Sequence, residues 1–145
     1  MEQNKALNYL ALARKAGRIE LGEEAVGAAA RAKKARLVAV ASDASDHTRR
    51  RAQSFVDGTG QPCVQIPVTK AELGNIVGRT ELAIVALTDA AMALAFLRAM
   101  PENPAYGEAI ADLEKRTKRI RQHAKEEKIH RQKASGKKVV YAKKN

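Results

Sequence analysis

The chain of 145 residues has no tryptophan, one cysteine and only five phenylalanine and tyrosine side chains. A single cysteine, Cys63, cannot form an internal disulfide, which excludes a disulfide-stapled secreted domain and makes the cytoplasm the expected location. So few aromatic rings leave little on which successive bases can stack, which argues against a single-strand binder of that type. The longest apolar stretch, residues 82–97, is interrupted by Thr88 and Asp89. It is shorter than the ~20 residues that span a bilayer, so we expect no membrane segment.

Sequence motifs of common enzyme classes are missing as well. The chain has no G-x-G-x-x-G and no G-x-x-x-x-G-K-[ST] phosphate-binding loop, and residues 58–60 predict a turn that ends a helix. His47 stands beside three arginines, where a solvated histidine is expected rather than a general base. His123 and His130 are seven residues apart in a basic segment, where we expect no metal site. Cys63 lies in an apolar tract and predicts a small core residue. We therefore expect no catalytic residue, no cofactor and no metal.

Positive charge is what the chain has in excess. It holds 27 Lys and Arg against 16 Asp and Glu, a formal net charge of +11. Residues 1–100 hold 14 basic and 10 acidic side chains, and from Lys115 onward the count is 13 against 2. Such a surplus repels itself unless a polyanion neutralises it, which phosphates do with release of counterions. The arm thus favours nucleic acid over a solubilising tail. The basic runs at 33–36 and 49–51 are either further patches or a solvated face.

Apolar tracts and helical patterns alternate along the first hundred residues. The apolar spacing predicts a helix that ends at Gly17, then strands at 18–21, 37–41, 63–66 and 82–87, with helices at 22–33, 46–57, 70–77 and 89–100 between and after them. Strands and helices that alternate at this spacing predict an α/β fold, a three-layer α/β/α sandwich.

Two prolines three residues apart follow Met100, and they predict a break that separates a domain of residues 1–100 from an arm of residues 101–145. Within the arm, residues 105–134 favour a basic helix, and residues 137–145 form a tail that we expect to be unfolded when alone. One narrow stripe on the helix is suited to dock on the domain or on another copy of the chain: Ile110, Leu113, Thr117, Ile120 and Ala124.

Several short motifs occur in a characteristic order: residues 12–18, Gly22-Glu23-Glu24, residues 35–38, residues 42–45, residues 69–74 and Val77-Gly78. This succession covers roughly residues 4–98 and resembles the kink-turn RNA-binding ribosomal protein superfamily of the L-seven-Ae and L-thirty-e type, in particular its small bacterial paralogues. The resemblance implies a mixed four-stranded sheet between helical layers. It also implies binding of structured RNA, commonly in or near the ribosome, without catalysis. Nothing comparable covers the C-terminal arm.

The resemblance also implies a site. In the superfamily, the N-terminus of the second helix enters a sharply bent internal loop, where Gly-x-Asn-Glu-x-x-Lys reads tandem sheared G·A pairs. Gly22 matches the glycine, Glu24 falls on the asparagine, Ala25 on the glutamate and Ala28 on the lysine. An acid at the asparagine position is within the pattern of the bacterial branch, whereas the missing lysine departs from it. The loss of the lysine contact weakens the free energy of RNA binding by on the order of 1–3 kcal/mol. A second loop, which lays apolar residues over extruded nucleotides, maps to residues 78–82.

The physical chemistry of this helix start supports the attraction to RNA. A helix N-terminus offers unpaired N–H groups and partial positive charge to phosphate, and Gly22 allows a close approach of the backbone. Glu23 or Glu24 can accept hydrogen bonds from N1 and N2 of a guanine. Simple capping of the helix by the same carboxylates is the alternative.

We therefore predict an RNA-binding protein of bacterial type that recognises kinked RNA, and we expect this RNA to be ribosomal. We expect the protein to be a monomer or weak dimer and not to contact a membrane. Truncation at Met100 is expected to flatten the salt dependence of binding while leaving discrimination of kinked RNA unchanged. The alternatives are an interaction module that dimerises or docks on ribosomal proteins, and a DNA-binding protein. The predicted RNA-binding residues are Lys15, Arg18, Gly22, Glu23, Glu24, Lys33 and Lys34 for the groove, Arg79, Thr80, Glu81 and Leu82 for the second loop, and Lys115, Arg116, Lys118, Arg119 and Arg121 for the arm.

Overall fold

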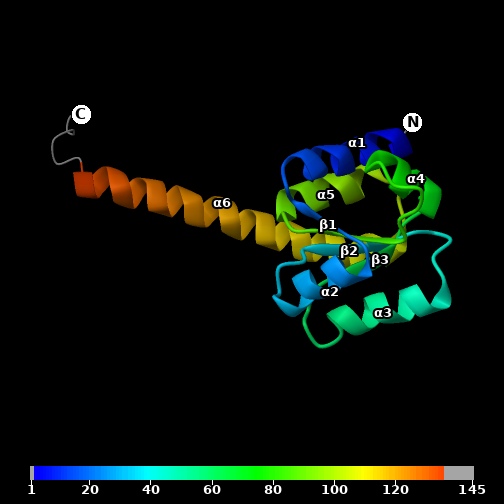
Figure 1. The fold of residues 1–145 in the computed structure, drawn as a ribbon. Coiled ribbons are helices and arrows are strands. Elements are labelled where there is room, and N and C mark those ends of the chain that lie inside the picture. The colour runs from blue at the N-terminus through cyan, green and yellow to red at the C-terminus, as the bar shows by residue number, and fades with distance from the viewer. Residues whose placement is uncertain (1, 136–145) are drawn as a thin grey trace. The chain divides into compact units, whose positions relative to one another are not determined.

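A computed structural model describes residues 2–135, and a mixed four-stranded sheet lies at its centre (Figure 1). The strands are β1 (Ile19–Leu21), β2 (Leu37–Val40), β3 (Cys63–Gln65) and β4 (Ile84–Leu87), in the order β1-β4-β2-β3. Strands β1 and β2 are antiparallel to β4, and β2 is parallel to β3. The predicted tail of residues 137–145 lies outside the described residues.

Helices cover both faces of the sheet. Helices α1 (Glu2–Lys15), α4 (Lys70–Ile76) and α5 (Ala90–Ala99) form one layer, and α2 (Glu23–Arg31) and α3 (Asp46–Val56) form the other (Figure 1). A 3-10 turn, η1 (Pro104–Tyr106), leads into α6 (Gly107–Ser135). The predicted α/β/α sandwich and its C-terminal basic helix are confirmed. None of the described helices is long and apolar enough to cross a membrane.

Local sequence signals explain where the elements begin. Every residue of β2 and β4 is buried, as expected for apolar strands covered on both faces. The Ser45 side chain accepts a hydrogen bond from Thr48 N at the start of α3, and Asp89 caps α5 in the same way. Thr69 and Glu72 form a reciprocal capping box at the start of α4.

Strand direction determines which turns meet. Because β1, β2 and β3 run one way and β4 the other, the ends of the first three strands and the start of β4 lie at one end of the sheet. We call this the Gly22 end; its turns are Gly22, residues 41–45, 66–69 and 77–83. We call the opposite end the Lys33 end; its turns are residues 16–18, 32–36, 57–62 and 88–89.

The chain divides into two compact units, residues 1–114 and 115–145. The first holds 14 basic and 14 acidic side chains, so the whole formal charge of +11 belongs to the second. The predicted domain boundary at residue 100 stays a prediction.

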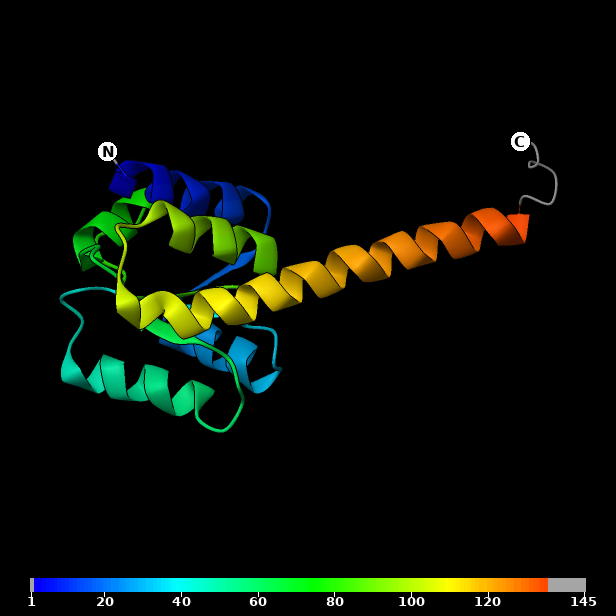
Figure 2. The ribbon, with the colours of Figure 1, turned by 180° about the vertical axis from the view of Figure 1, so that it is seen from behind.

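In the structure, residues 104–113 (yellow in Figure 2) lie beside the sheet between the two helical layers. Tyr106 and Leu113 are 2% and 0% exposed, and Tyr106 Oη donates to the Gln65 carbonyl of β3 at 3.3 Å. This segment therefore covers an edge strand that would otherwise be open to pairing.

Candidate nucleic-acid interface

Gly22 forms the turn between β1 and α2. Its φ of 89° and ψ of 164° lie in a region that is accessible to glycine and almost closed to other residues. The Gly22 N–H donates to the Ile84 carbonyl at 3.0 Å, and its own carbonyl accepts the first helical hydrogen bond, from Val26 N at 2.9 Å. Among the described residues, no side chain caps this helix. The N–H groups of residues 23–25 therefore precede the helical ladder and face outward with the positive end of the helix dipole.

The second predicted loop lies next to this helix start. The position at which a Cβ atom would project from Gly22 is 3.7 Å from Arg79 Nη1. Arg79, Thr80 and Glu81 are all exposed. The fold thus brings together the glycine turn and the loop that the sequence analysis assigned to one RNA site.

Residues of two sequence motifs, 42–45 and 69–74, hold the second loop in place. Gly74 has no room for a side chain, because a Cβ atom there would lie 2.7 Å from the Arg79 carbonyl oxygen and 2.9 Å from the Glu81 backbone. The Gly74 carbonyl accepts from Arg79 N at 2.8 Å, and the Lys70 carbonyl accepts from Leu82 N at 2.9 Å. The Asp43 carboxylate in turn accepts from Lys70 N at 2.8 Å. These residues fix the backbone of the loop against α4.

Leu82 differs from its predicted role. Its side chain is 5% exposed and belongs to the hydrophobic core. The apolar side chain therefore anchors the loop from beneath and is not on the surface where the prediction put it. What the loop presents to solvent is polar: Arg79, Thr80 and Glu81.

The two acids after Gly22 have separate surroundings. Glu23 Oε1 lies 2.7 Å from Arg51 Nε, and Glu23 Oε2 accepts from Thr48 Oγ1 at 2.9 Å. Glu23 is therefore engaged by α3 and does not present a free carboxylate. Glu24 is exposed, and within the part of the chain that the structure describes it has no hydrogen-bond partner. Neither acid caps α2 through its side chain.

Arg51 lies beside Glu23 at this surface, and the predicted set of residues did not include it. Its guanidinium is held by Glu23 and lies over the Phe55 ring, 5.1 Å from the ring centroid. Its side chain is still 47% exposed. An arginine fixed by a carboxylate and an aromatic ring loses less rotamer freedom when it contacts an anion. The three-arginine run was a signal, but only the contact with α2 distinguishes Arg51 from Arg49 and Arg50.

Four residues predicted for the same groove lie elsewhere. Lys15 and Arg18 precede β1, and Lys33 and Lys34 follow α2, so all four are at the Lys33 end of the sheet. Between Gly22 and Lys33 lie the nine residues of α2, about 13 Å of helix. The reason is topological: α2 runs back along the sheet and carries its C-terminal cations away from Gly22. The structure does not bring these cations to the Gly22 end.

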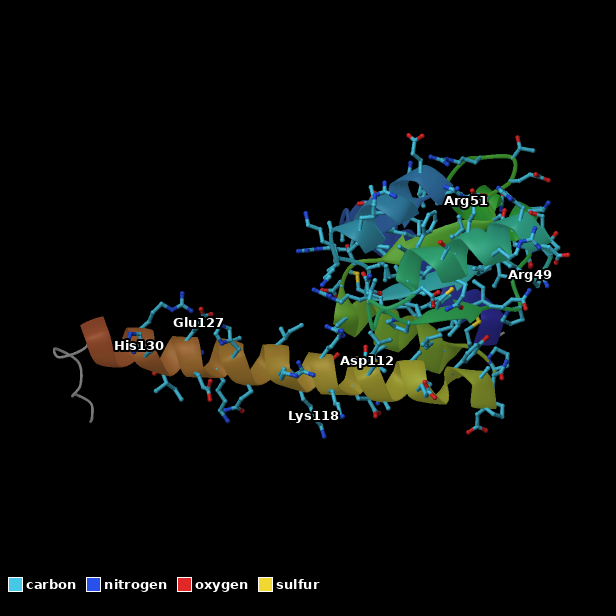
Figure 3. The ribbon with its side chains drawn as sticks, turned by 90° about the horizontal axis from the view of Figure 1, so that it is seen from below. Arg49, Arg51, Asp112, Lys118, Glu127 and His130 are labelled. Atoms are coloured by element: carbon cyan, nitrogen blue, oxygen red, sulfur yellow. The ribbon has the colours of Figure 1, made fainter. Side chains whose placement is uncertain are left out.

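The predicted arm residues lie in α6 of the second unit. Lys115, Lys118, Arg119 and Arg121 are exposed and Arg116 is partly buried. Successive residues of a helix are 100° apart, so Lys115, Lys118 and Arg119 lie on the side opposite the stripe of Thr117, Ile120 and Ala124, whereas Arg116 and Arg121 flank that stripe. Figure 3 shows Lys118, Glu127 and His130 projecting from different sides of α6. Glu127 lies 3.5 Å from His123 Nε2, and Glu126 accepts from Gln122.

Cys63 is partly buried at the start of β3 and packs against the core. Burial raises the pKa of its thiol to about 11, so it is protonated and weakly nucleophilic at neutral pH. No group of three or more His, Cys, Asp or Glu side chains suited to a metal occurs among the described residues.

Known proteins resemble this chain in sequence. Residues 4–94 match the Ribosomal protein L7Ae/L30e/S12e/Gadd45 family. The chain is 34% identical over 77 residues to the RNA-binding protein YlxQ of Enterococcus faecium, a match that covers 53% of this chain and 74% of that protein.

Two solved structures have the same fold. A protein of unknown function from Bacillus halodurans is 26% identical with a TM-score of 0.62, over 68% of this chain and 98% of that one. The 15.5kD RNA-binding protein of Giardia lamblia is 18% identical with a TM-score of 0.52, over 77% and 83% of the two chains. The chain belongs to the L7Ae/L30e/S12e/Gadd45 family of ribosomal proteins.

Proposed function

We propose that this protein binds structured RNA and recognises a kinked internal loop at the Gly22 end of its sheet, with ribosomal RNA as the expected target. The observation that carries the proposal is the uncapped start of α2, which lies beside the exposed Arg79 of the second loop. The match to the family and the name of the YlxQ relative support RNA as the ligand.

Each group at this surface suits a different part of a bent RNA. The open N–H groups of residues 23–25 and the Arg79 guanidinium suit phosphate oxygens. The free carboxylate of Glu24 repels phosphate, but it can accept hydrogen bonds from N1 and N2 of a guanine. Arg51 supplies a further cation, which Glu23 holds in place. Ala28 is exposed and has no polar group where the family motif has lysine, so one contact is missing.

The second unit supplies affinity without sequence preference. All of the surplus charge lies after Glu114. Each phosphate that a Lys or Arg neutralises releases condensed counterions, and the affinity gained in this way falls steeply with salt. In this proposal the family domain therefore selects the shape of the RNA, and the basic helix holds the phosphate backbone.

The test is a comparison of two RNAs that differ only in the bend. We would measure the Kd of the full chain for a kink-turn RNA and for the same RNA with its G·A pairs replaced, each at two salt concentrations. The expected ratio of the two Kd values is on the order of ten and changes little with salt, because base-edge contacts specify and phosphate contacts do not. A ratio near one at both salt concentrations rejects recognition of the kink.

Two arginine variants test whether the second loop recognises the kinked RNA. Arg79→Ala is expected to lower the Kd ratio several-fold. Arg98→Ala removes the same charge from a residue that pairs with Glu114 on the same unit, and it is expected to keep the ratio. Equal competition by duplex DNA at fixed salt would favour the DNA-binding alternative.

A second candidate function is association of two chains through α6, which the exposure of Ile120 (57%) and Ile129 (44%) favours. Sedimentation equilibrium of the full chain without RNA tests it. A monomer across the micromolar range is evidence against it.

A further inference from the structure

Seven basic side chains from two segments, residues 14–18 and 31–36, lie at the Lys33 end of the sheet. Figure 1 shows the end of α1 and the turn after α2 at the same end of the sheet, on its two opposite faces. All but Arg36, which is partly buried, are exposed. Within the described residues, none of the seven forms an ion pair. They are Arg14, Lys15, Arg18, Arg31, Lys33, Lys34 and Arg36.

Helix dipoles explain only part of this cluster. Arg14 and Lys15 lie in the last turn of α1, and Arg31 lies in the last turn of α2, where a cation offsets the partial negative charge of the helix end. The other four cations, Arg18, Lys33, Lys34 and Arg36, lie beyond the helix ends.

Lys33 has an unfavourable backbone conformation for its residue type. Its φ is 58°, and no other non-glycine residue among the described residues has a positive φ. Lys33 N donates to the Ala30 carbonyl and Lys34 N to the Ala29 carbonyl, both at 2.9 Å, the paired hydrogen bonds of a Schellman motif. Glycine is the usual residue at this position, because a side chain there costs roughly 1 kcal/mol. Stability alone therefore favours glycine over lysine here.

No acidic side chain forms an ion pair with these seven cations within residues 2–135. The acids in the turns of this end are Asp57 and Asp89, and Asp112 lines the same cavity as Asp57. The Asp89 carboxylate accepts from Met92 N as the cap of α5, at 2.9 Å. Within the cluster, Arg36 Nη1 donates to the Lys33 carbonyl at 3.3 Å, and this hydrogen bond orients the Arg36 guanidinium. The first unit is neutral overall, so this end carries a local surplus that is balanced elsewhere on the unit.

From these observations we infer that Arg18, Lys33, Lys34 and Arg36 form a second contact surface for RNA phosphates, separate from the Gly22 end. The inference rests on the proposed function, since it assigns a further surface to the same ligand. The nine residues of α2, about 13 Å of helix, separate the two ends, which is farther than one side chain can reach. The Lys33 end therefore contacts a different stretch of RNA backbone from the stretch at Gly22, and a bound RNA spans α2 from end to end.

Lys33→Gly separates binding from stability. The glycine relieves the positive φ, so the free energy of unfolding in urea is expected to stay equal or rise. If Lys33 contacts phosphate, the slope of log K against log salt for the kink-turn RNA becomes shallower by about 0.7–0.9. Lys34→Ser tests the neighbouring cation. Lys5→Ser, at an exposed position near the start of α1 and remote from the Lys33 end, is the matched control and is expected to keep the slope of the wild type.

The outcomes distinguish this inference from the proposed function. A shallower slope for Lys33→Gly and Lys34→Ser, with an unchanged ratio of Kd values for kinked and G·A-replaced RNA, supports the second surface. Wild-type slopes and affinities in both variants overturn it, even if the wild-type chain discriminates kinked RNA well. If the wild-type ratio is one but the two variants still lower the slope, recognition of the kink fails and the phosphate surface stands.

Discussion

Gly22 and Lys33, the residues at the two ends of α2, both have positive φ angles, but only one of these conformations could be predicted. Gly22 has a ψ of 164°, which admits hardly any residue but glycine, so the glycine in the sequence marks the turn. Lys33 is in the left-handed helical region that other residues also enter at a modest cost, and a lysine gives no sign of it. Likewise, nothing in the order of residues distinguishes the engaged Glu23 from the free Glu24, because only the packing of α3 does so.

Gly22→Ala is expected to lower the free energy of unfolding by about 1–3 kcal/mol, because alanine strongly disfavours this backbone conformation. The added Cβ atom has room, since Arg79 Nη1 is 3.7 Å away, so the cost is that of the backbone. Urea denaturation measures it. Gly107→Ala is the matched control: Gly107 has helical angles and open space around it, so alanine is expected to be neutral or to stabilise by up to ~1 kcal/mol. Equal effects of the two substitutions would contradict the conformation described for Gly22.

The buried thiol of Cys63 predicts a loss of stability in alkali. Its pKa is raised from 9.0 to about 11 in the folded chain. Below pH 9 the thiol is neutral in both the folded and the unfolded chain, so the free energy of unfolding is fully retained there. As the pH rises through 11, ionisation of the thiol favours the unfolded chain and stability is lost. Between pH 8 and pH 10, wild type is expected to lose about 1 kcal/mol more than Cys63→Ala. Urea titrations at the two pH values measure the difference, and equal losses would show that the thiol is not buried.

At the scale of elements, each helix and strand was predictable from local patterns, whereas the contacts between elements were not. The capping residues Ser45, Thr69 and Asp89 and the apolar runs of β2 and β4 are visible in the sequence. That α2 runs back along the sheet, and so separates Lys33 from Gly22, depends on strand order and could not be read from spacing. The candidate site was therefore predicted as one group and is divided between two ends.

The contact between α2 and α3 can be measured with a double-mutant cycle on Glu23 and Arg51. The two side chains are 33% and 47% exposed, so the coupling free energy of this pair is expected to be about 0.5–1 kcal/mol and to weaken in salt. The control cycle uses Asp46 and Arg49, whose atoms are 3.9 Å apart with the acid 81% exposed, and its coupling is expected to be close to zero. If the first cycle gives no coupling either, Glu23 does not hold Arg51.

At the scale of the whole molecule, charge and fold are divided between different parts of the chain. The arm was predicted from its composition, since 13 basic residues after Glu114 need no structure to be recognised. The place where the core ends was predictable only in part: prolines suggested a break at 101–104, whereas Leu113 belongs to the stripe that was suited to dock on the domain. The burial of Tyr106 and Leu113 carries the core past the prolines. A truncation at Met100 therefore removes part of the core together with the charge.

Truncation after Glu114 is expected to separate the two contributions cleanly. The chain of residues 1–114 keeps the covered edge strand and has a formal charge of zero. It is expected to unfold in urea like the full chain and to keep the preference for kinked RNA, while the salt slope of binding becomes shallower by several units. The chain of residues 1–100 lacks Tyr106 and Leu113 and is expected to lose at least ~3 kcal/mol of stability. Loss of kink discrimination in the 1–114 chain would refute this division of roles.

The most direct test of the account is to find which part of an RNA lies beside the second loop. Thr80→Cys in a Cys63→Ser background allows an iron chelate to be tethered beside Arg79, and Asn8→Cys, on an exposed position of α1, serves as the reference. With a kink-turn RNA bound, strand cleavage from position 80 is expected to concentrate at the G·A pairs and the adjoining bulge, and cleavage from position 8 is expected to be weak. Cleavage spread evenly along the RNA from both positions would contradict it.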